Sequence, residues 1–111
     1  IYDWQDLEEM VAHLLPRLWE RGLRILDISC ANANYFDTSG RVIRMARSMW
    51  PGIVMGGASL SPEDAAAEVR AGLIDLVTWG RMLIANPDLA DRVREGRPLE
   101  TFSYDTLKDL V

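Results

Sequence analysis

The chain has 111 residues, of which 49% are hydrophobic and 26% are charged, and its formal net charge is −5. This composition fits one modest globular core, so we treat residues 1–111 as a single domain. The acidic balance and the scattered basic residues argue against nucleic acid or an anionic membrane as the main partner. No apolar run approaches the roughly 18 residues of a membrane span. The single cysteine, Cys30, excludes an internal disulfide framework and favours a reducing, cytoplasmic setting.

The first half of the chain predicts a helix, a strand and a second helix. Apolar residues at three- and four-residue steps predict a helix over residues 4–21, with Asp3 as its cap and Gly22 as its left-handed end. The segment LRILDIS, residues 23–29, is short and rich in branched side chains, and it predicts a strand buried on both faces. A polar loop follows, and residues 41–50 predict the second helix.

The second half continues the same alternation. IVMGG, from Ile53, predicts a buried strand that ends in two glycines, and LIDLVTW, residues 73–79, predicts another buried strand. Between them lies a predicted helix with Ser61 as its cap and Gly72 at its end. After the last strand, Asn86 is expected to cap a further helix that Gly96 closes.

Strands that alternate with helices in this way predict an α/β fold with about three parallel strands. Three strands do not close a barrel, and a complete eight-unit barrel needs about 250 residues. The sequence therefore leaves two architectures open. The chain is either a three-stranded open layer or a partial (β/α)8 TIM barrel whose remaining units come from elsewhere.

Glycines and one arginine follow the last two predicted strands. Gly56, Gly57 and Ala58 end the second strand, and Gly80 and Arg81 end the third. Ligands gather at the carboxyl ends of parallel strands, where glycines let backbone amides approach an anion and arginine offers a charged fork. These residues predict a phosphate site. Spacing alone leaves a second interpretation open, in which the glycines only turn the chain and the arginine pairs with a surface carboxylate.

Two stretches carry a family resemblance. GRMLIANPDLADRVREGRPL, residues 80–99, resembles the carboxyl-terminal signature of the old yellow enzyme family of flavin-dependent ene-reductases. GGASLSPEDAAAEVRAGLIDLVTWGR, residues 56–81, resembles the last two barrel strands of that family and the helix between them. The resemblance implies barrel strands six to eight, the cofactor FMN, NAD(P)H as hydride donor, and an activated alkene or enone as acceptor.

The resemblance also implies roles for particular residues. Gly57 and Ala58, with Gly56 before them, match the strand-seven amides that hold the FMN phosphate, and Gly80 and Arg81 match the strand-eight pair that completes the pocket. The catalytic groups of the family lie on earlier strands, so we assign no catalytic residue and no metal ligand here. The enzyme would then need the amino-terminal part of the barrel, from missing sequence or a companion chain, and the isolated chain is expected to be inactive.

Two alternatives to an oxidoreductase portion remain. The first is a non-catalytic half-barrel module that forms oligomers and binds phosphate or nothing. The second is a small, unrelated phosphate-binding α/β domain. Because isolated barrel segments expose strands and apolar helix faces, we expect a chain that is such a segment to associate.

Overall fold

The structure is a computed structural model that describes residues 5–30 and 34–110. It contains two compact units, residues 1–78 and residues 79–111, and each is described by itself. None of the helices in the described part of the chain is long and apolar enough to cross a membrane.

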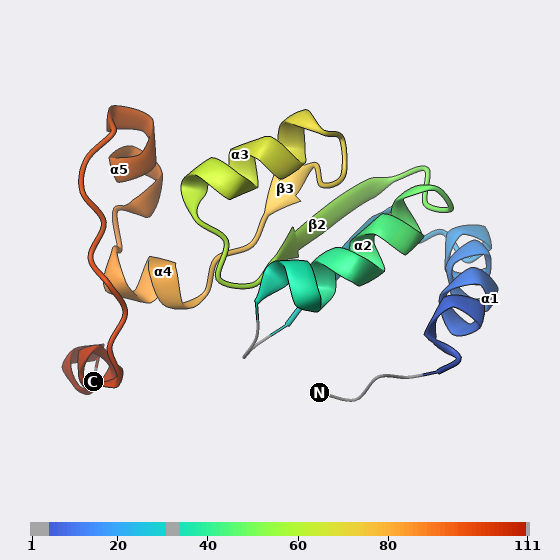
Figure 1. Ribbon diagram of the computed structural model, residues 1–111, viewed down its shortest axis with the longest axis horizontal. Coiled ribbons are helices and arrows are strands. Elements are labelled where there is room, and N and C mark those ends of the chain that lie inside the picture. The colour runs from blue at the N-terminus through green and yellow to red at the C-terminus, as the bar shows by residue number, and fades with distance from the viewer. Residues whose placement is uncertain (1–4, 31–33, 111) are drawn as a thin grey trace. The chain divides into compact units, whose positions relative to one another are not determined.

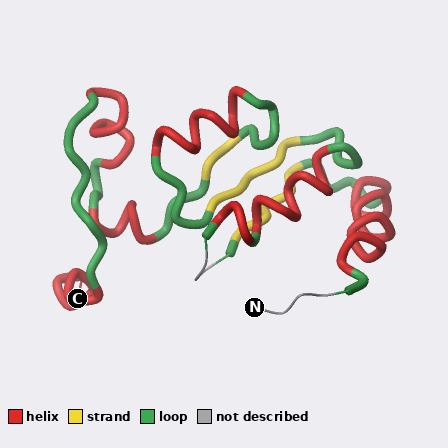
Figure 2. Tube along the Cα trace, viewed as in Figure 1, coloured by secondary structure: helices red, strands yellow, loops and turns green. Residues whose placement is uncertain are grey.

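The first unit contains the predicted parallel sheet, in the order β1-β2-β3 (Figures 1 and 2). The strands are β1 (Ile25–Ser29), β2 (Ile53–Gly57) and β3 (Leu76–Val77), and both pairings are parallel. The helical elements are α1 (Leu7–Glu20), η1 (Tyr35–Asp37), α2 (Ser39–Arg47) and α3 (Pro62–Arg70). The predicted alternation of helices and strands in this unit is therefore confirmed.

The predicted helix ends are confirmed where the residue type itself dictates them. The Ser61 hydroxyl accepts a hydrogen bond from the Asp64 N–H at 3.0 Å, as an N-cap does. Gly22 and Gly72 follow α1 and α3 with positive φ angles of 93° and 72°. Asp3, the expected cap of the first helix, lies outside the described residues, and Asp6 occupies the N-cap position of α1 without a side-chain bond.

Burial of the sheet differs between its two faces. On one face Val54 is fully buried, and a Cβ at Gly56 would overlap Ile43 of α2. On the other face Ile25 is 53% exposed and Leu76 is 50% exposed. The prediction that residues 23–29 form a strand buried on both faces is therefore wrong, and the predicted buried strands β2 and β3 are each exposed at one residue of this face, Ile53 and Leu76. An apolar strand pattern does not tell whether the covering surface belongs to the same chain.

A carboxylate joins β2 to β3 at the start of their pairing. The Asp75 backbone N–H donates to the Val54 carbonyl at 2.8 Å, and the Asp75 carboxylate accepts from the Val54 N–H at 2.8 Å. Arg47 of α2 donates to the same carboxylate oxygen at 2.8 Å. The Val54 hydrogen bond, followed by the Arg47 contacts, holds the pKa of Asp75 below its ordinary value.

The second unit contains α4 (Arg81–Ala85), α5 (Leu89–Glu95) and η2 (Tyr104–Leu110). The expectation that Asn86 caps a helix is wrong, because Asn86 follows α4 and the next helix begins at Leu89. The Asn86 side chain is fully buried, donates to the carbonyls of Met82 and Glu100, and accepts from the Glu100 N–H at 2.8 Å. It therefore fastens the end of α4 to a segment 14 residues further along the chain. Gly96 ends α5 in the left-handed conformation, as predicted.

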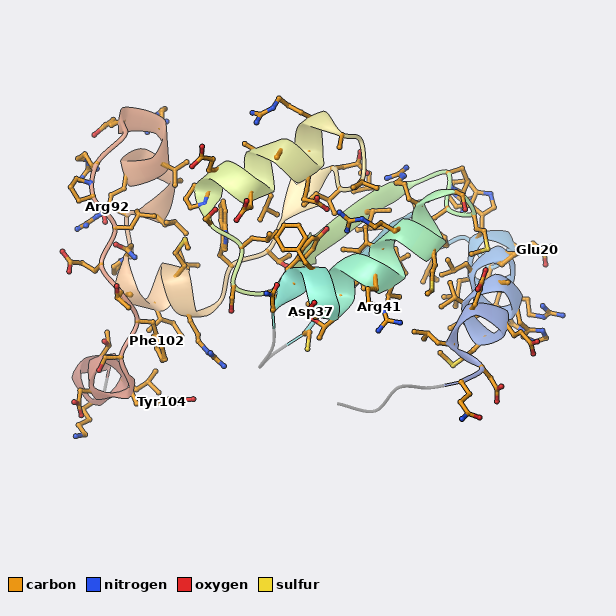
Figure 3. The ribbon with its side chains drawn as sticks, in the orientation of Figure 1. Glu20, Asp37, Arg41, Arg92, Phe102 and Tyr104 are labelled. Atoms are coloured by element: carbon orange, nitrogen blue, oxygen red, sulfur yellow. The ribbon has the colours of Figure 1, made fainter. Side chains whose placement is uncertain are left out.

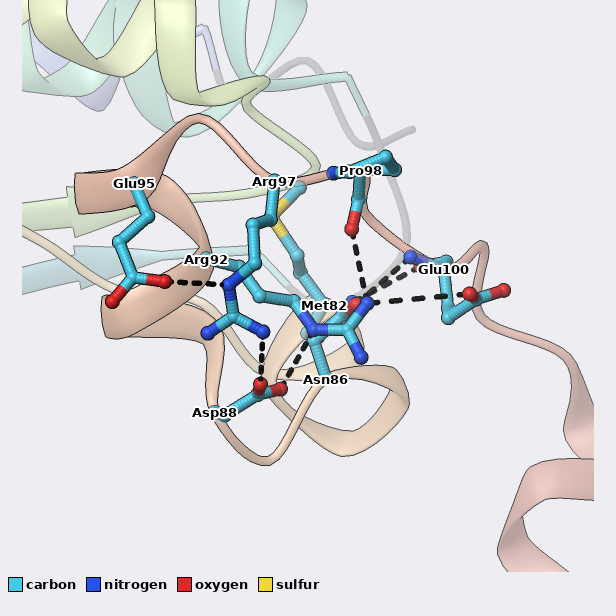
Figure 4. Close-up of polar contacts among 8 residues, drawn as sticks. All are labelled: Met82, Asn86, Asp88, Arg92, Glu95, Arg97, Pro98 and Glu100. Atoms are coloured by element: carbon cyan, nitrogen blue, oxygen red, sulfur yellow. Dashed lines mark hydrogen bonds and ion pairs between the residues drawn. The ribbon is translucent and has the colours of Figure 1, made fainter.

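Ion pairs support the same segment (Figure 4). Asp88 accepts from Arg92 at 2.7 Å and from Arg97 at 3.0 Å. Arg92 also donates to the Pro98 carbonyl at 2.9 Å. Side chains within residues 80–99, the stretch that resembles the family signature, thus hold the segment after α5 against α5.

The substitution Asp75→Asn should lower the free energy of unfolding by up to about 1 kcal/mol near pH 6, because it removes the charge that Val54 and Arg47 contact and because solvent screens part of this interaction. The native pKa is lowered, so this contribution is present above the ordinary value of 3.8 and is lost as pH falls through the native value. Urea unfolding of both forms should show a difference that shrinks in acid. A difference of the same size at about pH 6 and at about pH 3 would contradict this role. Asp105→Asn, in an exposed pair with Lys108, is the matched control.

Candidate phosphate-binding site

Gly56 and Gly57 form the carboxyl end of β2, and the backbone of Thr78 leaves no room for a side chain at Gly57, while a side chain at Gly56 would displace the end of the Ile43 side chain. A Cβ at Gly56 would overlap Ile43 of α2 and lie 3.2 Å from Ile74. A Cβ at Gly57 would overlap the carbonyl oxygen of Thr78, the residue that follows β3 by one position. The two glycines therefore allow α2 and β3 to approach β2 closely, whatever else they do.

The chain turns immediately after these glycines. Ala58 is half-buried, and Ser59 is exposed with a φ of 51°, the only positive φ of a non-glycine residue within residues 5–30 and 34–110. Left-handed backbone at such a residue costs free energy and is found mainly at tight turns and functional sites. The carboxyl end of β2 is thus followed by a bend at Ala58 and Ser59, beside the end of β3.

Ser39 is a residue of this region that sequence reasoning missed. It is the first residue of α2, its side chain is buried, and its hydroxyl donates to the Gly57 carbonyl at 3.0 Å. The two residues are 18 positions apart in the chain. A serine near a helix start is ordinary in sequence, so no pattern indicated this contact.

A polar cluster of the buried Tyr35 and Glu68 with the partly exposed Arg44 supports the start of α2. The Tyr35 hydroxyl donates to Glu68 at 2.7 Å, and Arg44 donates to the other oxygen of Glu68 at 2.8 Å. Arg44 also donates to the Gly40 carbonyl at 3.0 Å. Burial, followed by the hydrogen bond to Glu68, raises the pKa of Tyr35, which keeps its hydroxyl protonated as a donor.

Gly80 and Arg81 lie in the second unit. The sequence predicted a strand running into them, but β3 ends at Val77, Gly80 is the N-cap residue of α4, and Arg81 is the first residue of α4. A Cβ at Gly80 would meet no heavy atom of the described residues within 4 Å. The space beside Gly80 is therefore open in the described part of the chain.

An aromatic side chain accompanies the Arg81 guanidinium. Its Cζ lies 5.9 Å from the ring centroid of Phe102, a distance typical of a cation–π contact. Phe102 packs edge-on against Tyr104 with ring centroids 5.4 Å apart (Figure 3). These contacts belong to the second unit and set the environment of the guanidinium within it.

The predicted site residues thus form two groups. The structure brings Gly56, Gly57 and Ala58 together at the end of β2, and it places Gly80 and Arg81 together at the start of α4. Within the described residues, no cluster of three His, Cys, Asp or Glu side chains is arranged to hold a metal ion.

Comparisons with known proteins identify related chains. No family model matches the sequence. A curated relative named "Probable flavin mononucleotide-dependent alkene reductase", from Leishmania infantum, is 30% identical over 95 residues, which are 86% of this chain and 26% of the relative. The chain thus spans about a quarter of the length of this relative.

Solved structures give the same result for the fold. This chain superimposes on the structure of TcOYE with pHBA with a TM-score of 0.79 at 25% sequence identity. The superposition includes 92% of this chain and 27% of the TcOYE chain. Morphinone reductase in complex with tetrahydroNAD gives a TM-score of 0.72 at 27% identity and covers 89% of this chain and 26% of that one. The three-stranded unit and its helices correspond to part of the TIM barrel of these enzymes. The chain is therefore related to the old yellow enzyme family and corresponds to about a quarter of the length of the proteins it matches.

Proposed function

We propose that the chain supplies the FMN phosphate-binding part of an FMN-dependent NAD(P)H oxidoreductase of the ene-reductase type. The observation that carries the proposal is the shared carboxyl edge of β2 and β3, where Gly56 pairs with Val77 and the chain turns at Ala58. Parallel α/β folds bind ligands at this edge, and barrels often hold phosphate after their last strands. The flavin reductase name of the Leishmania relative supports FMN as the ligand.

In this proposal the phosphate contacts come from both groups of residues. Gly56, Gly57 and Ala58 contribute backbone amides, and Gly80 and Arg81 contribute an amide and a positive charge. Only Trp79 separates Thr78 from Gly80 in the chain. Gly80 and Arg81 therefore belong to the segment that directly follows β3. The open space beside Gly80 fits the close approach of a phosphate, and a guanidinium suits its charge.

The hydride chemistry belongs to the cofactor. When bound, FMN would carry a hydride from NAD(P)H to an activated alkene or enone, and the protein binds and orients it. The tetrahydroNAD complex of morphinone reductase supports a nicotinamide donor. This chain's share is to anchor the phosphate end, and we assign none of its residues a catalytic role.

The exposed sheet face supports a partner that completes the barrel. Ile25, Ile53 and Leu76 lie on the same face and are 41–53% exposed. Inward-facing side chains of a closed barrel pack in layers against those of the other strands. We propose that the amino-terminal part of the barrel, as further sequence or as a companion chain, buries this face in a reducing, cytoplasmic setting.

The same exposed face favours a second candidate, a non-catalytic module that associates with copies of itself. Flavin binding separates the two candidates. We expect the 111-residue chain to retain FMN, seen as yellow absorbance and quenched flavin fluorescence, when mixed with the part of the Leishmania relative that it does not match. No flavin binding, with or without that partner, would contradict the enzyme proposal and favour the module.

The substitution Arg81→Ala should weaken FMN binding by about tenfold to a hundredfold, the loss expected for a charge-assisted hydrogen bond. Binding of riboflavin, which lacks the phosphate, should be unchanged. Fluorescence titration with both flavins provides the measurement. Arg94→Ala, on the exposed surface of α5, is the matched control. Equal losses for FMN and riboflavin would remove Arg81 from the phosphate site.

Without a partner, the chain should associate at micromolar concentration, because its strand edges and apolar sheet face are uncovered. Sedimentation velocity measured over a range of concentrations should show a rising average mass. Substituting Leu76→Lys on the exposed face should shift the association to higher concentration. A monomer at all concentrations would contradict the need for a covering surface.

A further inference from the structure

The Ser39 hydroxyl bonds to the backbone at the carboxyl end of β2. This side chain is 4% exposed, and it donates to the Gly57 carbonyl at 3.0 Å from the first turn of α2. Gly57 is the last residue of β2, so its carbonyl belongs to the peptide that links the strand to Ala58. Ser39 therefore contacts the backbone at the point where the chain leaves the sheet.

Because the Gly57–Ala58 peptide is planar, the hydrogen bond at the Gly57 carbonyl also determines the direction of the Ala58 N–H. In a trans peptide the carbonyl of one residue and the N–H of the next point in opposite directions. A hydrogen bond that holds the Gly57 carbonyl toward α2 therefore aims the Ala58 N–H away from α2. Gly57 itself has no Cβ to restrict its backbone, so rotation of this peptide needs an external restraint.

Contacts from other elements hold the start of α2, which can provide that restraint. A Cβ at Gly40 would lie 2.7 Å from a ring carbon of Tyr35, so the helix backbone rests directly on this buried ring. Arg44 and Tyr35 both bond to Glu68 of α3, and Arg44 also bonds to the Gly40 carbonyl. Ser39 thus donates from a backbone position that α3 and the Tyr35 ring hold in place.

We propose that Ser39 is a positioning residue for phosphate binding, which acts by fixing the Gly57–Ala58 peptide so that its amide faces the phosphate. The proposal rests on the proposed FMN function and adds to it a residue that lies outside the two groups of site residues. Ser39 does not touch the ligand in this account. Its effect is specific to the phosphate end of the flavin nucleotide, because only that end meets the aligned amide.

The test uses the 111-residue chain together with the part of the Leishmania relative that it does not match. A series of substitutions at position 39 weakens the hydrogen-bond donor step by step. Ser39→Thr keeps a hydroxyl, Ser39→Cys has a weaker thiol donor, and Ser39→Ala has none. The ratio of FMN to riboflavin affinity should fall in the order Ser, Thr, Cys, Ala, by about tenfold in total for one hydrogen bond. Riboflavin affinity alone should stay constant.

A ligand-free readout accompanies the titrations. The ¹⁵N shift of the Ala58 amide reports hydrogen bonding at the preceding carbonyl, and it should move along the same series. Ser48→Ala removes a hydroxyl that bonds to Met45 on the exposed end of α2, and it should change neither readout. If Ser39→Ala does not fold, the Thr and Cys variants carry the comparison.

The two possible failures are distinguishable. Wild-type chain that binds FMN no better than riboflavin would contradict the proposed phosphate anchor, and the role of Ser39 with it. Wild-type preference for FMN that persists unchanged in the Ser39 variants would overturn the role of Ser39 alone. Equal losses of FMN and riboflavin affinity would also overturn it, because they would indicate a general structural role.

Discussion

The close approach of β2 and β3 at their carboxyl ends is the constraint on which the first unit depends. The carbonyl of Thr78 occupies the place where a side chain of Gly57 would lie, and the Thr78 N–H donates to the Gly56 carbonyl at 2.9 Å. Any residue other than glycine would separate the two strands at this point. Since Ala58 and Ser59 turn directly after this contact, it sets where the loop that follows β2 begins.

A polar cluster, buried at Tyr35 and Glu68, connects this edge of the sheet to the helices. Tyr35, Arg44 and Glu68 come from three different elements, and every hydrogen bond among them has ordinary length. Such clusters cost free energy when they are incomplete and specify one arrangement when each group has a partner. Here the cluster fixes the first turn of α2. Ser39, which lies in that turn, donates a hydrogen bond to the Gly57 carbonyl. In our proposal, this packing determines the direction of the Ala58 amide.

The sequence predicted the features that depend on local residue types. Serine and glycine ends of helices, such as Ser61 and Gly96, follow from backbone chemistry within a few residues, and so does the alternation of strands and helices. It could not predict features that depend on distant partners. Asn86 resembles a helix cap in sequence, but its side chain bonds to the backbone of Glu100. No residue near Ser39 in the sequence indicates its hydrogen bond to the Gly57 carbonyl. The sequence did not predict the exposed face of β1 for the same reason. An apolar strand pattern does not show which surface covers the strand.

A structure of the chain with bound FMN and the completing part of the barrel tests the central claim most directly. The account predicts the FMN phosphate within hydrogen-bond distance of the Ala58 amide and of the Arg81 guanidinium, with the Ser39 hydroxyl still bonded to the Gly57 carbonyl. A phosphate bound elsewhere, or bound without contact to either group of residues, would contradict it.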